Sequence, residues 1–185
     1  MILSDVDIEQ QLRMGRIILD PFDMKDLQPA SVDVRLGNDF RIFKTSVNRY
    51  IDPQNLVEDL TEQVVIPPDG EFILHPGQFA LGTTHENIEL PSDILGKLEG
   101  KSTLGRLGLM IHSTAGYVDP GWKGELTLEL SNVSNLPIIL RPQMRIGQLS
   151  FETMTSSVRR PYGSRELGSH YQGQSGATPS HRLVD

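Results

Sequence analysis

The segment Glu125-Leu126-Thr127-Leu128-Glu129-Leu130 gives the clearest indication of the fold. Alternate residues of a β-strand point to opposite faces of a sheet. The three leucines therefore share one face of the predicted strand, and the two glutamates share the other with Thr127. This pattern indicates a half-buried strand whose leucines enter a core.

The same two-residue period recurs on both sides of this segment. Further strands are predicted at 32–36, 40–42, 64–66, 72–74, 79–81, 88–90, 94–98, 138–140 and 146–151. Turn sequences separate them, including Pro67-Pro68-Asp69-Gly70, His75-Pro76-Gly77 and Asp119-Pro120-Gly121. Many short strands at such spacing predict a mainly β sandwich, jelly roll or closed barrel.

Two short helices are expected within this β framework. Ser4 is a candidate N-cap with Asp7 three residues later, which is the spacing of a capping box, and Gly15 would end the helix. Residues 102–108 form the second candidate. After Arg159 the chain becomes rich in Gly and Ser, and composition alone predicts a flexible tail.

Composition excludes several classes of protein. The 185 residues suit one domain, and a net charge of −7 argues against a nucleic-acid binder. There are no cysteines. The His/Cys zinc site of metal-dependent deaminases is therefore excluded, and the five His show no H-E-x-x-H spacing. The acidic N-terminus and the lack of a long apolar run predict a cytoplasmic protein without a signal peptide or membrane span.

Three parts of the chain could bind a ligand. Gly100-Lys101-Ser102-Thr103-Leu104-Gly105-Arg106 offers cations, hydroxyls and a turn into a helix, which suits a phosphate, although an exposed basic turn would look the same. It is not a P-loop, because position 95 is Leu. Either Glu125 or Glu129 could be a general base, and the residues alone leave that choice open. The aromatic and amide groups of the tail could cover a nucleotide.

Taken together, these segments resemble the dCTP deaminases, a branch of the trimeric dUTPase-like family. The resemblance is carried by 28–36, 75–77, 99–108, 119–121, 127–129 and 171–174, in this order, and extends to about Pro179. It implies a distorted jelly-roll or β-barrel domain over residues 1–160, with 161–185 as an active-site lid. It also implies a homotrimer with active sites shared between subunits, and no zinc.

The resemblance also assigns roles to residues. Glu129 would be the general base and then acid that activates water for attack on C4 of cytosine. Ser102 and the carbonyl of Ala115 would position the water, and Arg106 would hold Glu129 ionised. The other expected substrate contacts are Lys101, Thr103, Leu104, Gly105, Asp119, Thr127, Leu128, Gln148, Tyr162, His170 and Gln174. Position 170 is commonly Lys in such proteins. His170 is therefore a weaker contact whose affinity for phosphate would depend on pH.

The segment Ala115-Gly116-Tyr117 bears on the product. Single-step members of the family tend to carry His-Arg at positions 116 and 117, so Gly116 and Tyr117 resemble members that also cleave the triphosphate. The predicted reaction is dCTP to dUMP, ammonia and pyrophosphate, with Mg²⁺ carried by the triphosphate. The expected ligands are dCTP, dUTP and, as an inhibitor, dTTP. The alternatives are a deaminase that stops at dUTP, a dUTPase, and a non-catalytic nucleotide-binding module.

Overall fold

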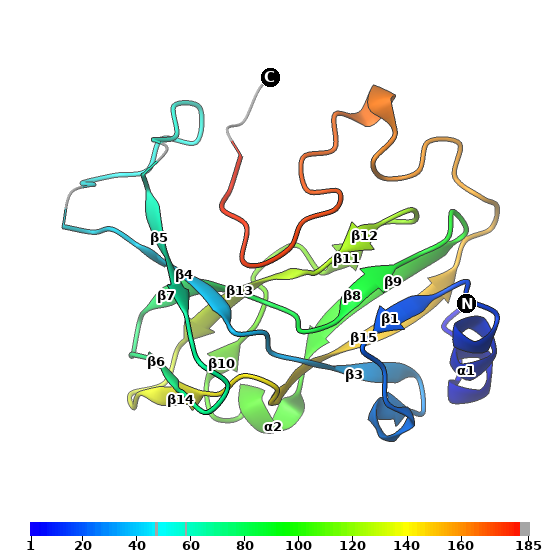
Figure 1. The fold of residues 1–185 in the computed structure, drawn as a ribbon, viewed down its shortest axis with the longest axis horizontal. Helices are drawn as coiled ribbons and strands as arrows, with labels where there is room; N and C mark the ends of the chain where they lie inside the picture. The colour runs from blue at the N-terminus through cyan, green and yellow to red at the C-terminus, as the bar shows by residue number, and fades with distance from the viewer. Residues whose placement is uncertain (47, 58, 182–185) are drawn as a thin grey trace.

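The computed structural model describes residues 1–46, 48–57 and 59–181, and most of its regular structure is antiparallel β-strand (Figure 1). The longer strands are β3 (Ser31–Arg35), β4 (Asp39–Phe43), β5 (Thr61–Val65), β7 (Phe79–Thr83), β9 (Ile94–Gly100), β13 (Thr127–Asn132) and β15 (Arg145–Thr153). The shorter ones are β1 (Ile18–Asp20), β2 (Leu27–Gln28), β6 (Phe72–Leu74), β8 (Asn87–Glu89), β10 (Leu109–Met110), β11 (Tyr117–Val118), β12 (Lys123–Gly124) and β14 (Ile138–Leu140).

Two five-stranded sheets make up most of the domain. One has the strand order β10-β13-β7-β4-β5 and the other β11-β9-β15-β3-β2. A three-stranded sheet, β1-β8-β12, and the pair β14-β6 complete the described strands. The mainly β, jelly-roll-like prediction is confirmed. Each sheet has two edge strands, so no sheet of the described residues closes into a barrel.

The core follows the alternation of β13. Leu126, Leu128 and Leu130 are buried, while Thr127 and Glu129 lie half-buried on the opposite face. Phe40 of β4 stacks on Phe72 of β6, with 4.3 Å between ring centroids, and this contact joins two sheets. The two faces of β13 therefore have separate roles, one in the core and one toward a cavity.

Both predicted helices are present. In α1 (Asp5–Arg13) the Ser4 side chain accepts from the Asp7 N–H and the Asp7 carboxylate accepts from the Ser4 N–H, so the capping box is complete. The second, α2 (Ser102–Gly105), is shorter than the predicted 102–108. Single 3₁₀ turns lie at η1 (Met24–Asp26) and η2 (Arg165–Leu167). No helix among the described residues is long and apolar enough to cross a membrane.

The C-terminal tail does not extend into solvent as composition alone predicts. Between Pro161 and His181 it passes above β11 and β12, in the orange-to-red part of Figure 1, and hydrogen-bonds to the segment 120–127. The Tyr162 N–H donates to the Pro120 carbonyl (2.9 Å), and the Gly173 N–H donates to the Lys123 carbonyl (2.7 Å). Backbone hydrogen bonds at two separate points therefore hold the tail against the domain.

A buried ionic cluster lies beside β3. Arg35 pairs with Asp26 and lies near Glu86 (Nη1 to Oε1, 3.6 Å), and the Arg35 N–H donates to Glu86 Oε2 (2.9 Å). Arg145 also contacts Asp26 (2.7 Å). Carboxylates removed from water must be paired in this way or become neutral.

Glu86 should make stability fall with rising pH. Burial raises its pKa from 4.5 to about 7, against the opposing effects of the Arg35 N–H and guanidinium. The folded state therefore favours the neutral acid. Its stabilising effect is present below pH 4.5 and is lost as pH rises through 7, by roughly 3 kcal/mol at most.

Glu86→Gln should remove most of this dependence, because an amide keeps a carbonyl acceptor for Arg35 without a charge to desolvate. Urea unfolding of variant and parent at pH 5 and pH 8, at one protein concentration, measures the difference. A parent-minus-variant difference that is the same at both pH values would contradict the prediction.

Candidate active site

A cavity of about 630 Å³ opens between the outer face of β13 and the tail. This volume lies in the range of small-molecule sites. The predicted site residues that line it are Ala115, Tyr117, Thr127, Glu129 and Gln174. They come from the loop before β11, from β11 and β13, and from the tail. The fold thus brings together residues that lie up to 59 positions apart in the chain, from 115 to 174.

Two hydrogen bonds to the segment that follows β10 hold Glu129 at the cavity wall. Its N–H donates to the Ile111 carbonyl (2.9 Å), and its Oε2 accepts from the Ser113 N–H (2.8 Å). One side of the carboxylate is thereby oriented by a main-chain donor. Because Ala115 lines the same cavity, a water between its carbonyl and Glu129 is compatible with this arrangement.

Gln174 closes the cavity from the tail side. Its Nε2 donates to the Glu125 carbonyl (2.7 Å) and to Thr127 Oγ1 (3.2 Å). Its Oε1 is buried without a partner among the described residues. A buried acceptor usually has a donor, so a ligand N–H at this position would satisfy it.

Tyr117 lines the cavity, whereas Gly116 does not. Tyr117 is 70% exposed. Gly116 packs against β9, where its carbonyl accepts from the Leu98 N–H (2.8 Å). A Cβ at position 116 would lie 3.2 Å from the Leu98 carbonyl oxygen and 3.4 Å from the His112 ring. A larger residue there would therefore require the loop to shift.

The α2 residues lie away from this cavity. Ser102, Thr103, Leu104, Gly105 and Arg106 are not among its lining residues. Figure 1 shows α2 at the opposite edge of the molecule from the tail. Both Ser102 and Arg106 are exposed. Within one chain, the predicted water-positioning hydroxyl and the predicted arginine do not meet Glu129.

Lys101, which follows β9, and Gln148 of β15 both lie beside Asp33 of β3. Lys101 Nζ contacts the buried Asp33 (2.5 Å), and Gln148 is opposite Asp33 in the β15–β3 register. Gln148 Oε1 also accepts from Ser31 Oγ (3.3 Å). Neither Lys101 nor Gln148 lines the cavity of the same chain.

The remaining predicted contacts lie around the tail or in the core. Asp119 is exposed in the turn before Trp122. Tyr162 packs on Trp122 (5.2 Å between centroids), and burial raises the pKa of its hydroxyl, which therefore stays protonated. His170 is exposed and stacks on His181, 5.3 Å away. Leu128 is fully buried in the core, so a ligand could reach only its main chain.

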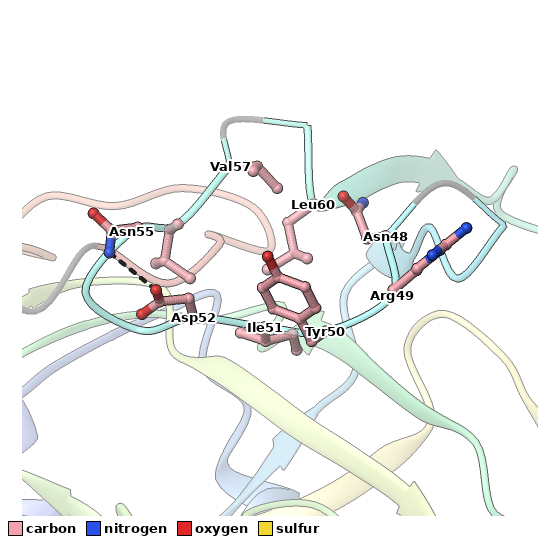
Figure 2. Close-up of a pocket in the computed structure, with 9 residues that line it drawn as sticks. Asn48, Arg49, Tyr50, Ile51, Asp52, Asn55, Val57 and Leu60 are labelled. Carbon is pink, nitrogen blue, oxygen red and sulfur yellow. Dashed lines mark hydrogen bonds between the residues drawn. The ribbon is translucent and has the colours of Figure 1, made fainter.

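A second pocket of about 330 Å³ lies in the loop between β4 and β5 (Figure 2). Tyr50, Ile51 and Leu60 line it, and a hydrogen bond from Asn55 Nδ2 to Asp52 Oδ2 (2.9 Å) closes one side. It contains none of the residues singled out in the sequence. Leu56, Val57 and Leu60 are common to both pockets, so the loop forms part of the wall of the larger cavity.

Sequence reasoning missed the apolar wall of the cavity, which includes Phe43, Phe79 and Leu81. Their period-two pattern indicates only strands, and nothing in it says which face meets a cavity. It also missed Asp33. An acid between Val32 and Val34 in a predicted strand could have drawn attention to this residue, because the structure buries that strand on both faces and pairs Asp33 with Lys101.

The fold and the cavity define a mainly β protein with a carboxylate directed into a pocket that its own tail covers. Residues 2–154 match the family model described as dCTP deaminase-like. The chain belongs to this dCTP deaminase-like family.

Curated relatives match over nearly the whole chain. A protein of Mycolicibacterium gilvum named "dCTP deaminase, dUMP-forming" is 57% identical over 97% of this chain and 95% of its own length. A protein of the same name from Corynebacterium jeikeium is 55% identical over 100% of this chain and 98% of its own.

Among solved structures, the 2'-deoxycytidine 5'-triphosphate deaminase of Agrobacterium tumefaciens superposes with a TM-score of 0.63 at 25% identity. The match covers 81% of this chain but only 46% of that longer one. The fold therefore agrees with that of a deaminase of the same family.

Proposed function

We propose that this protein is a dCTP deaminase that converts dCTP and water to dUMP, ammonia and pyrophosphate. The observation that carries the proposal is the cavity where Glu129, Ala115, Thr127 and Gln174 converge in a chain 55–57% identical to proteins named for this activity. Inhibition by dTTP and a cytoplasmic location stay predictions.

Glu129 supplies the acid–base chemistry of the first step. Its carboxylate takes a proton from a water as the oxygen attacks C4 of cytosine. It passes that proton to N3 of the ring. It then moves the proton of the new C4 hydroxyl to the 4-amino group, which leaves as ammonia while the C4 oxygen becomes the uracil carbonyl. Acid–base help of this kind is worth about 10²–10⁴-fold in rate. The second step adds water at the α-phosphate and releases pyrophosphate.

Base recognition falls to Gln174 and Thr127 in this proposal. The unpartnered Oε1 of Gln174 is an acceptor for an N–H of the base, and its Nε2 is held by the Glu125 carbonyl and Thr127. The amide is thus preorganised before the ligand arrives. The tail that carries Gln174 is the lid of the site, and it excludes water from the reacting atoms.

The active site is completed by a neighbouring subunit. Ser102 and Arg106 lie on an exposed turn far from the tail, so one chain alone supplies only part of the predicted constellation. The exposed apolar residues Leu107, Met110, Val133 and Leu136 surround this turn and the strands beside it, and a subunit contact would bury them. A closed trimer brings α2 of one subunit to the cavity of the next.

Magnesium enters with the nucleotide. No group of three or more His, Cys, Asp or Glu in the part of the chain that the structure describes could hold a metal ion. The triphosphate oxygens and water would therefore ligate Mg²⁺, as is usual for this ion. When bound, Mg²⁺ neutralises phosphate charge.

Product analysis tests the proposal directly. Purified protein with dCTP and Mg²⁺ should release ammonia and pyrophosphate in equal amounts and form dUMP without accumulating dUTP. The proposed reason is that Gly116 lets its loop pack against β9, which places Tyr117 at the cavity wall, so that the uracil nucleotide stays bound while a second water reaches the α-phosphate. A parallel incubation with dUTP as substrate measures the second step alone.

Each other outcome identifies a different protein. Stoichiometric free dUTP would show a single-step deaminase. Conversion of dUTP without ammonia release from dCTP would show a dUTPase. Binding of dCTP without turnover would show a nucleotide-binding module.

A further inference from the structure

We propose that Glu125 is the positioning residue that fastens the C-terminal tail, and with it Gln174, over the cavity. The expected effect on the KM for dCTP rests on the proposed function, whereas the expected effect on the tail itself does not depend on any substrate. Glu125 precedes the start of β13 by two residues and precedes Glu129 by four.

Both oxygens of the Glu125 carboxylate accept hydrogen bonds from the tail. Its Oε2 accepts from the Gly176 N–H (2.7 Å) and from Thr83 Oγ1 of β7 (3.1 Å), and its Oε1 accepts from Ser175 Oγ (3.2 Å). Hydrogen bonds to an ionised carboxylate are about twice as strong as neutral ones. Glu125 therefore links the tail to β7 with charge-assisted bonds.

The main chain of Glu125 holds the same part of the tail. Its N–H donates to the Gln174 carbonyl (3.1 Å), and its carbonyl accepts from Gln174 Nε2 (2.7 Å). Three consecutive tail residues, 174–176, thus bind to Glu125 through both its main chain and its side chain. Loss of the hydrogen bonds to the Glu125 carboxylate would therefore loosen Gln174, whose side-chain amide lines the cavity.

Asp39 provides a second attachment immediately downstream. Its Oδ2 accepts from the Ala177 N–H (3.2 Å), and Gln63 Nε2 holds the same carboxylate (3.0 and 2.9 Å). Gly176 has φ +74°, and a Cβ there would lie 2.2 Å from Asp39 Oδ2. The glycine is what allows the tail to pass between the two carboxylates.

These contacts distinguish the two acids of the strand. The Glu125 oxygens are occupied by the tail and β7, whereas Glu129 faces the cavity and its carboxylate accepts from the Ser113 N–H. A group occupied by three donors is poorly placed to take a proton from water. Glu125 thus acts through Gln174, and Glu129 acts on the reacting atoms.

The test compares Glu125→Ala and Glu125→Gln with the control Glu62→Gln, which makes the same change at an exposed position of β5. Amide hydrogen exchange of residues 172–178 is measured in the full-length protein without ligand. Steady-state kinetics with dCTP follow. Glu125→Ala should speed exchange at Gly176 by about tenfold or more, and KM should rise about tenfold while kcat changes less. The control should change neither quantity.

Glu125→Gln keeps one acceptor oxygen and nearly the same shape, so it should give intermediate effects. It also decides the question if the alanine variant fails to fold. Unchanged tail exchange in a folded Glu125 variant would overturn the proposal. If turnover also slowed by about 100-fold or more while the tail stayed unchanged, Glu125 would belong to the chemistry instead. If the parent does not turn over dCTP, the exchange result still decides the role of Glu125.

Discussion

Replacing Glu129 with Gln should lower the rate of ammonia release from dCTP by at least about 10²-fold. The amide has nearly the same shape, so the hydrogen bond from the Ser113 N–H (2.8 Å to Oε2 in the parent) can be kept by the amide oxygen. The amide cannot take a proton from water. The loss should therefore appear in kcat, with KM and thermal stability close to those of the parent.

Stopped assays for ammonia, together with calorimetric binding of dCTP, measure the two effects separately. Glu62→Gln is the matched control, because its side chain is exposed on β5 and does not line the cavity. Activity within a few-fold of the parent in Glu129→Gln would remove Glu129 from the role of general base.

Mixing two inactive variants should restore activity. In a cyclic trimer with sites between neighbours, a site is intact when Glu129 comes from an Arg106→Ala chain and Arg106 comes from a Glu129→Gln chain. Random assembly at equal amounts makes about one quarter of the sites intact. The physical basis is the separation of α2 from the cavity within one chain.

The measurement is the turnover rate after joint refolding of the two variants, compared with each variant refolded alone. Ser102→Ala mixed with Arg106→Ala is the control, because both changes lie on α2 or at its end and no mixed site regains both groups. No gain in the first mixture, with trimers confirmed by light scattering, would show that each chain builds its own site.

Much of the β framework was predictable from local pattern. The alternation at 126–130, the strands on both sides and the Ser4–Asp7 capping box all appear as expected. Four short strands, β1, β2, β10 and β12, were not predicted. Each has only two or three residues. Such segments are extended because a partner strand lies beside them, and no period is visible over so short a length.

The tail shows a different limit. Its Gly and Ser residues predict flexibility, because they bury little apolar surface. In the structure the same kind of residue allows close backbone approach: a Cβ on Gly124, whose φ is +136°, would lie 2.8 Å from the Gln174 carbonyl oxygen. The docking depends on acceptors supplied by distant segments, which the composition of the tail does not reveal.

The sequence by itself determined where most of the longer strands lie, which face of β13 enters the core, and which family the chain resembles. These properties follow from the two-residue period and from motif order, both of which are local along the chain. The tertiary structure alone decided that Glu129 faces the cavity while Glu125 binds the tail, and that Ser102 and Arg106 lie away from both. Glu125 and Glu129 share one face in the alternation of the sequence, so the pattern treats them alike, and only the groups packed against each of them give the two carboxylates different environments.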